Sequence, residues 1–376
     1  MIDLIRFWKR KPTILFFIHL MQDLDMYLPL LSSIKNKNDF AIKVCILDKI
    51  LEKSPRISKA LAELGIKYIQ VSRMLILGGL KPNLLGIQAV ITASESTANP
   101  HKLAHILTKR ANKLGIFTYT LQHGLENIGL NYSDEKYTLE DVKFASHKIL
   151  IWGDVDALPS ELSLETRKKC VSVGCPKSIK ANKGIQLSHH RDHIIAVFEN
   201  LHWERYNEEY RMLFLQDLEK TAKYFPDTTF LVKPHHAGVW LTHKYQGQLP
   251  QSDNIIIADP RNHCWEDFTA PALIATVDGA ITTPSTVALD AARFGCPVSV
   301  ISYGLNLSNY QPLPLINDFI DWIGFVKRLR NSEERLVIKK ELQSYVSNNI
   351  IVGDAVTRIV DLIANDICTK NYISKN

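Results

Sequence analysis

The chain has 376 residues, of which 46% are hydrophobic and 22% are charged, and its formal net charge is +6. This length suits two domains, and the sequence has no apolar run of the roughly 18 residues that would predict a transmembrane helix. The charge suits an anionic substrate or an anionic membrane surface. The absence of a dense Lys/Arg run with interleaved aromatic residues argues against a nucleic-acid partner.

The N-terminus and the cysteines indicate a compartment. Lys9, Arg10 and Lys11 precede a short apolar run that lacks a small-residue cleavage site, so we expect no signal peptide. The six cysteines form no Cys-x-x-Cys pair, which favours reduced thiols in a cytoplasmic protein without structural zinc. Residues 5–11 mix bulky apolar and basic side chains. They suit either a peripheral contact with the inner face of the cytoplasmic membrane or a solvated chain end.

The first half of the chain alternates short apolar runs with helical patterns. Helices are expected at 24–34, 57–64 and about 102–114, the last two ending at glycines. The expected strands are 13–19, 41–47, 68–71, 89–92, 117–121 and 148–152. Strands that alternate with helices predict parallel βαβ units and a doubly wound sheet.

A second alternating series follows a polar stretch that has the composition of a linker. Its expected elements are strands at 193–198, 229–232, 254–258, 279–282 and 298–301 and a helix at 208–224. The fold class is therefore α/β, with two doubly wound Rossmann-like domains at 1–176 and 193–376 and a linker at 177–192. The helical pattern at about 333–367 is expected to cross back to the first domain. Ligands in such sheets bind at the carboxyl ends of strands, most simply in a cleft between the domains.

The segment 277–298 predicts a strand, a polar turn, a helix and the start of another strand. Thr283, Ser285 and Thr286 lie where the helix begins, and this end of a helix suits a phosphate. Asp290 lies one helical turn further, where it could accept hydrogen bonds from a ribose. The alternative is ordinary helix capping, which needs no ligand.

Two further strand ends carry titratable side chains. His123 follows the expected strand 117–121 and precedes Gly124, and a histidine there is a candidate general base. Glu126 either orients His123 or is the base itself, while the alternative is a histidine that caps the next helix. Glu199 ends the first strand of the second domain. It is expected to bind a sugar hydroxyl or to act as an acid, base or nucleophile, or else to be a solvated loop carboxylate.

The expected strand 229–232 runs directly into Lys233-Pro234-His235-His236. Lys233, His235 and His236 form a donor cluster that suits a phosphate. A metal site is disfavoured, because adjacent histidines cannot easily reach one ion together and no nearby carboxylate completes the ligand set. We therefore expect no metal and no cofactor.

Taken in order, these segments resemble GT-B glycosyltransferases of bacterial surface polysaccharide synthesis, above all capsule-type Kdo transferases, GT-B sialyltransferases and teichoic acid glycerophosphotransferases. The resemblance rests on Gln122-His123-Gly124, the hinge Gly174-Cys175-Pro176-Lys177, Lys233-Pro234-His235-His236, and Ser285-Thr286 followed by Asp290 and Gly295-Cys296-Pro297-Val298. Two departures are His236, where the family has proline, and the residues around Asp278, which differ from the Asp-Tyr-Ser-Ser of the glycerophosphotransferases.

The resemblance implies metal-independent transfer of a sugar from a nucleotide donor to a glycan or glycolipid of a capsule or lipopolysaccharide. The second domain would bind the donor and the first the acceptor. A CMP-linked donor is implied, with Kdo as the first expectation and sialic acid as the second, while uridine and guanosine sugars stay open as alternatives. Glu199 would be the nucleophile of a retaining enzyme. The alternatives are a CDP-glycerol-type glycerophosphotransferase, a GT-B-like sugar-nucleotide epimerase and a two-domain ligand-binding protein without catalysis.

Overall fold

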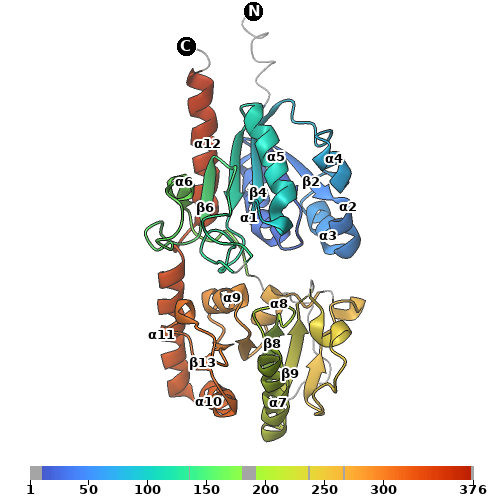
Figure 1. Ribbon diagram of the computed structural model, residues 1–376, viewed down its shortest axis with the longest axis vertical. Coiled ribbons are helices and arrows are strands. Elements are labelled where there is room, and N and C mark those ends of the chain that lie inside the picture. The colour runs from blue at the N-terminus through green and yellow to red at the C-terminus, as the bar shows by residue number, and fades with distance from the viewer. Residues whose placement is uncertain (1–10, 135, 180–191, 236–237, 266, 374–376) are drawn as a thin grey trace, which may run out of the picture. The chain divides into compact units, whose positions relative to one another are not determined.

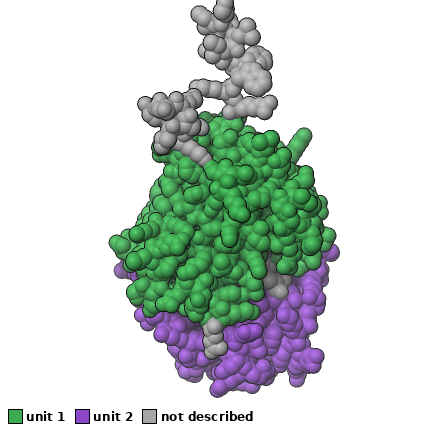
Figure 2. All heavy atoms as spheres, turned by 45° about the horizontal axis from the view of Figure 1, so that its top comes forward, with its two compact units in different colours: residues 1–178, 349–376 green, residues 179–348 purple. Residues whose placement is uncertain are grey.

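The computed structural model describes residues 11–134, 136–179, 192–235, 238–265 and 267–373. The chain divides into two compact units, which Figure 2 shows in different colours. Unit 1 comprises Met1–Ser178 and Asn349–Asn376, and unit 2 comprises Ile179–Asn348. The chain therefore leaves unit 1 once and returns to it for its last helix.

Unit 1 is built on a seven-stranded parallel sheet whose strand order is β3-β2-β1-β4-β5-β6-β7. Figure 1 labels β2, β4 and β6 of this sheet. Its strands are β1 (Thr13–Ile18), β2 (Ala41–Leu47), β3 (Tyr68–Val71), β4 (Ile87–Ala93), β5 (Phe117–Leu121), β6 (Lys148–Ile151) and β7 (Cys170–Ser172). Its helices are α1 (Asp23–Lys37), α2 (Asp48–Lys53), α3 (Arg56–Glu63), α4 (Arg73–Leu77), α5 (Lys102–Lys113), α6 (Leu164–Lys169) and α12 (Ala355–Ile373), with the short η2 (Asn99–His101) before α5.

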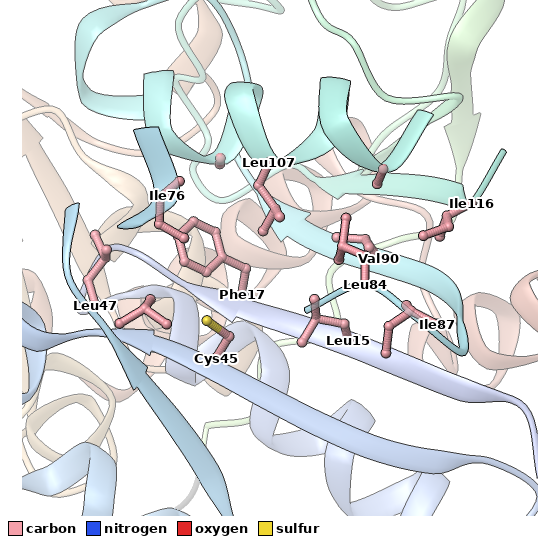
Figure 3. Packing of buried hydrophobic residues seen from close by; sticks show 13 residues of the cluster. Leu15, Phe17, Cys45, Leu47, Ile76, Leu84, Ile87, Val90, Leu107 and Ile116 are labelled. Carbon is pink, nitrogen blue, oxygen red and sulfur yellow. The ribbon is translucent and has the colours of Figure 1, made fainter. Parts of the chain in front are cut away.

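Alternate side chains of β1 point to opposite faces of this sheet, as strand geometry requires. Leu15 and Phe17 lie in a buried cluster with Leu107 of α5 (Figure 3). On the other face, Phe16 packs edge-on against Tyr27 of α1, with ring centroids 5.3 Å apart. Helices therefore cover the sheet on both faces, which is why β1 is apolar on both of its faces from Ile14 to Ile18.

The C-terminal helix α12 belongs to unit 1 and packs against α1 and β4. Two polar contacts fix it there. The Tyr119 hydroxyl of β5 donates to Asp366 Oδ2 at 2.8 Å, and Lys148 Nζ of β6 lies 2.8 Å from both oxygens of the same carboxylate. The helical pattern expected at about 333–367 is confirmed as two helices, with a break at which Gly353 takes a φ of +97°.

Unit 2 has a six-stranded parallel sheet with the order β10-β9-β8-β11-β12-β13. Its strands are β8 (His193–Glu199), β9 (Thr228–Pro234), β10 (Ile255–Ile257), β11 (Gly279–Thr282), β12 (Val298–Ile301) and β13 (Leu315–Ile316). Its longer helices are α7 (Glu208–Tyr224), α9 (Thr286–Phe294), α10 (Phe319–Arg330) and α11 (Ser332–Asn349), and its shorter ones are η3 (Trp240–Lys244), η4 (His263–Trp265), α8 (Ala270–Ile274) and η5 (Ser308–Tyr310).

Both sheets reverse their strand order beside their first strand, and we call this position the switch point of the sheet. In unit 1, β1 lies between β2 and β4, and in unit 2, β8 lies between β9 and β11. Connections leave such a pair of strands in opposite directions, which opens a crevice at their carboxyl ends where ligands of doubly wound sheets bind. The predicted α/β class with two Rossmann-like domains is confirmed. The topology also locates one candidate site in each unit.

Candidate functional sites at the two switch points

The switch point of unit 1 gathers side chains that follow β1, β4 and β5. His19 comes directly after β1, Ser94 directly after β4 and His123 two residues after β5. Ser94 has a φ of +53°, in a region that non-glycine residues seldom occupy and that costs free energy to hold. Such a backbone at a strand end is a pointer to function.

Asn127 holds the imidazole of His123. Its Oδ1 lies 3.1 Å from His123 Nδ1 and also accepts the Ser94 hydroxyl at 2.9 Å. An amide oxygen can only accept, so Nδ1 carries the proton and the lone pair of His123 is on Nε2. The sequence offered Glu126 as the group that orients His123. The structure places Glu126 half-buried in the same loop and shows Asn127 in contact with His123 Nδ1, so the role of Glu126 stays a prediction.

Two more histidines line up with His123. The ring centroid of His101, in η2, lies 5.4 Å from that of His123 and 6.1 Å from that of His19. His101 is 4% exposed and His19 is 3% exposed, so both side chains are buried. Burial lowers the pKa of His101 to about 2, with further lowering by the other two imidazoles. At neutral pH His101 is therefore uncharged.

Asp23 supplies the negative charge of this cluster. Its Oδ2 accepts the backbone N–H groups of His19 and Leu20, each at 2.9 Å, and lies 2.9 Å from His19 Nδ1. Burial lowers the pKa of His123 to about 4, the Asp23 carboxylate opposes that shift, and His19 adds to it. His123 is thus a neutral proton acceptor, and the nearby Asp23 carboxylate favours the protonated form of the His123 ring.

In unit 2, Glu199 ends β8 at the switch point and is 3% exposed. Its Oε2 accepts the backbone N–H of Leu201 at 2.7 Å. Burial raises the pKa of Glu199 to about 7, while hydrogen bonds from the Leu201 and Leu241 backbones act in the opposite direction. A carboxyl with this pKa can both donate and accept a proton near neutral pH. The solvated-loop alternative does not describe this buried side chain.

The turn between β11 and α9 is tied to the end of β8. Thr283 Oγ1 accepts the Asn200 backbone N–H at 3.1 Å and donates to Asn200 Oδ1 at 2.5 Å, and Asn200 Nδ2 donates to the Pro284 carbonyl at 3.1 Å. Ser285 is the N-cap of α9, and its Oγ accepts the backbone N–H of Val287 at 3.2 Å. The capping role considered from the sequence is therefore present, at the helix end where a phosphate site is expected.

The remaining predicted residues of α9 differ in exposure. Thr286, the first residue of the helix, is half-buried, whereas Asp290 is 1% exposed. Asp290 lies one turn along the helix from Thr286, as its spacing predicted. Its contact with a ribose stays a prediction.

Lys233 and His235 lie at the end of the neighbouring strand β9. Lys233 Nζ donates to the Trp265 carbonyl at 3.4 Å, and burial lowers its pKa to about 8 against the opposing effect of the Asp259 carboxylate. The backbone N–H of His235 donates to the Glu199 carbonyl at 2.9 Å, which joins the two strand ends. His236, the third member of the predicted donor cluster, lies outside the described residues.

His202 stacks on His235, with ring centroids 5.0 Å apart and planes 24° from parallel. Burial lowers the pKa of His202 to about 4, and the charges of Lys244 and Arg211 lower it further. Gly238 makes room for this ring, because a Cβ added there would lie 2.1 Å from His202 Cγ. The fold thus leaves room at this strand end for the stacked imidazoles of His202 and His235.

Several residues of these sites had no role assigned from the sequence: Ser94, His19, Asp23, His101, Asn127, Asn200 and His202. The available signal was position, because most of them follow a strand by one to three residues. Within the residues that the structure describes, no group of three or more His, Cys, Asp or Glu side chains is placed to hold a metal ion. In the same described part of the chain, no helix has the length and apolar character needed to cross a membrane.

Comparison with known proteins gives matches in structure only. No protein-family model matches the chain, and no curated protein matches it in sequence. Similar solved structures include the UDP-GlcNAc 2-epimerase of Neisseria meningitidis bound to UDP-GlcNAc, with a TM-score of 0.64, 14% identity and coverage of 94% of this chain and 100% of that one.

Two further solved structures are also similar. HepE of Anabaena, in complex with UDP and glucose, matches with a TM-score of 0.58 and 12% identity over 94% of this chain and 100% of that one. The wall teichoic acid polymerase TagF, as a histidine-to-asparagine variant with CDPG, matches with a TM-score of 0.59 and 12% identity over 96% of this chain and 90% of that one. The predicted resemblance to GT-B enzymes is therefore confirmed at the level of structure, and the chain has the GT-B fold.

Proposed function

We propose that this protein is a nucleotide-sugar-dependent glycosyltransferase that acts on a glycan or glycolipid acceptor. The observation that carries the proposal is His123, a neutral imidazole whose Nδ1 is engaged by Asn127 at the switch point of unit 1. This arrangement leaves Nε2 to take a proton from an acceptor hydroxyl. Unit 1 would thus activate the acceptor and unit 2 would hold the donor.

The proposed step is an inverting displacement. The acceptor oxygen forms a bond to the anomeric carbon as the bond from that carbon to the phosphate oxygen breaks. The hydroxyl proton moves to His123 Nε2, and the nucleotide leaves with the bonding electron pair. The imidazolium that forms is stabilised by the Asp23 carboxylate, whose charge raises the pKa of His123. Glu126 is the alternative base, and Glu199 is the candidate nucleophile of a retaining reaction.

For the donor, the proposal uses the switch point of unit 2. Lys233, together with His235 and His236, would neutralise the phosphate charge that develops as the nucleotide leaves. Thr283, Ser285 and Thr286 would place the positive end of the α9 dipole on the same phosphate. Asp290 would accept from the ribose. No metal ion takes part in the proposed step.

The proposed donor is a nucleotide sugar whose base is a pyrimidine. The similar structures named above carry UDP-GlcNAc, UDP with glucose, and CDPG, and the motifs of this chain favour a cytidine donor. The motifs predict CMP-linked Kdo as the specific donor, and none of the ligands in those structures supports that prediction. Comparing the affinities of the protein for cytidine and uridine nucleotides decides which of these two bases the donor carries.

A sugar-nucleotide epimerase is the second candidate, because epimerases reach TM-scores of 0.60 to 0.64 against this chain. Glu199, with its pKa raised to about 7, would serve such an enzyme as an acid or base. The two functions differ in their need for an acceptor. An epimerase converts its nucleotide sugar alone, whereas a transferase releases nucleotide rapidly only when acceptor is added.

The test is an NMR assay of UDP-GlcNAc and CMP-Kdo, each incubated with the protein with and without a glycolipid extract. We expect acceptor-dependent release of one nucleotide, with a rate reduced at least 100-fold in His123→Ala and changed little in Glu126→Gln. A new sugar stereoisomer formed without acceptor would establish the epimerase instead. Full activity of both His123→Ala and Glu126→Gln would refute the assignment of the base.

A further inference from the structure

Away from the candidate sites, unit 1 exposes a set of large apolar side chains. Met74 and Leu77 of α4 are 73% and 42% exposed, and Leu80 and Leu85 of the following loop are 70% and 84% exposed. We call these four side chains, with the basic residues around them, the α4 surface. Single exposed apolar residues are ordinary, but four within twelve positions mark a surface that binds something.

The apolar side chains of the α4 surface are held outward by their neighbours. Ile76 and Leu84 alternate with them and lie in the buried cluster of unit 1 (Figure 3). Arg110 of α5 donates to the Lys81 carbonyl at 3.0 Å and also to the Pro82 carbonyl. The loop is thereby fixed on α5, and its leucines cannot turn inward without displacing core residues.

The stretch of the chain that forms the α4 surface and α5 is almost purely basic. Between residues 64 and 125 the chain has a single acidic residue, Glu95, which is 0% exposed and accepts hydrogen bonds from Ala145 and Ser146. The same stretch contains seven basic residues on and around α4 and α5: Lys67, Arg73, Lys81, Lys102, Lys109, Arg110 and Lys113. Apart from Arg110, which is half-buried, all of them are exposed. The partner is therefore expected to be both apolar and anionic.

We propose that the α4 surface docks unit 1 on an anionic lipid bilayer. Met74, Leu77, Leu80 and Leu85 enter the boundary between headgroups and acyl chains, and the surrounding cations contact lipid phosphates. A second copy of the chain fits less well, because a symmetric contact would bring the same cations of both copies together. The inference is independent of the proposed function, since it involves neither His123 nor unit 2.

The experiment is flotation of the full chain with vesicles of phosphatidylcholine containing 30% phosphatidylglycerol, compared with vesicles of phosphatidylcholine alone. We expect binding to the anionic vesicles that weakens between 0.05 and 0.5 M NaCl, because salt screens the headgroup charge. Leu80→Ser/Leu85→Ser should reduce the partition coefficient about tenfold or more. Arg73→Glu/Lys81→Glu should do the same.

Matched controls come from unit 2. Ile320→Ser/Leu336→Ser alters side chains that are 69% and 64% exposed, and Lys339→Glu/Lys340→Glu alters two exposed lysines. Both controls should bind vesicles as the unaltered chain does, and thermal melting should show every variant folded. Vesicle binding unchanged in the two α4-surface variants would overturn the proposal. So would binding that depends only on residues 2–10, or a dimer dispersed by Leu80→Ser/Leu85→Ser in a chain that binds no vesicles.

Discussion

Asn127 Oδ1 lies 3.1 Å from His123 Nδ1, and this contact decides which nitrogen of the ring can accept a proton. The amide oxygen requires a donor, so the neutral ring carries its proton on Nδ1. Ser94 donates to the same oxygen at 2.9 Å and thereby fixes the amide. His123 is thus contacted at Nδ1 by a neutral side chain, while the charge of Asp23 raises the pKa of His123.

Replacing Asn127 should change the tautomer of His123 before it changes the fold. In Asn127→Leu the Nδ1–H loses its acceptor, and we expect a mixture of tautomers and a fall in kcat of about tenfold or more. Nitrogen-15 chemical shifts of the His123 ring report the tautomer directly. Nucleotide affinity should be unaltered, because the residue lies in unit 1. An unchanged tautomer in the variant would show that Asn127 does not orient the ring.

Glu199 should make the protein less stable as the pH rises. Its pKa is raised from 4.5 to about 7, so the folded state holds a proton that the unfolded state releases. The associated stability is fully present below pH 4.5 and is lost as the pH rises through about 7. Glu199→Gln should therefore match the unaltered protein near pH 5 and exceed its free energy of unfolding at pH 8.5 by an amount on the order of 2 kcal/mol. Urea unfolding at both pH values measures the difference, and equal differences at both would contradict the raised pKa.

His101 should act in the opposite direction. Burial holds its pKa at about 2, below the ordinary value of 6.5, so the stability linked to this group is present above pH 6.5 and is lost as the pH falls. We expect His101→Gln to gain stability relative to the unaltered chain by about 2 kcal/mol on going from pH 7.5 to pH 5. Urea unfolding at those two pH values measures the difference in free energy of unfolding between the variant and the unaltered chain. The same difference at both pH values would mean that the His101 imidazole is not desolvated.

Ser285 has a structural role and a proposed ligand role, and a matched variant separates them. Ser285→Ala should cost about 1 kcal/mol of stability, because it removes the cap on Val287 N–H. Ser163 caps α6 in unit 1 in the same way, with its Oγ accepting from Thr166 N–H at 3.2 Å. Both variants should lower the melting temperature, but only Ser285→Ala should weaken nucleotide binding measured by calorimetry. Equal nucleotide affinity in the two variants would assign Ser285 to capping alone.

Lys233 should make nucleotide affinity depend on pH. Its pKa is lowered to about 8 by burial, so the charge that would attract a phosphate is lost as the pH rises past that value. We expect the Kd for the preferred nucleotide to rise several-fold between pH 7 and pH 9. In Lys233→Arg the charge persists, and the affinity should stay level over this range. A parallel rise of Kd in both proteins would point to another titrating group.

The sequence predicted the positions of many helices and strands correctly, short ones included. The bounds of β2, β3, β5, α7, β11 and β12 agree with expectation, and most other expected elements differ by one to three residues. The strands β7 and β13, with three and two residues, are too short to show a period. The helix α10 was also not anticipated. Its sequence, Phe319–Arg330, carries a clear N-cap at Asp318, whose carboxylate accepts from Ile320 and Asp321.

The candidate sites were predictable only in part, for a topological reason. Strand ends pointed to His123, Glu199 and Ser285 one segment at a time. The assembly of His19, His101 and His123 depends on β1 lying next to β4 and β4 next to β5. These neighbours are far apart along the chain, and no local pattern specifies their order. Contacts such as that of Asn127 also depend on loop geometry, which periodicity does not encode.

Calorimetric titration of the protein with CMP, CDP, UDP, GDP and ADP, with EDTA present, tests the central claim most directly. We predict that one pyrimidine nucleotide binds, that Lys233→Met weakens its binding at least tenfold, and that His123→Ala leaves the affinity unchanged. Binding of none of these nucleotides, or binding that is indifferent to Lys233, would contradict the assignment of unit 2 as the donor-binding unit.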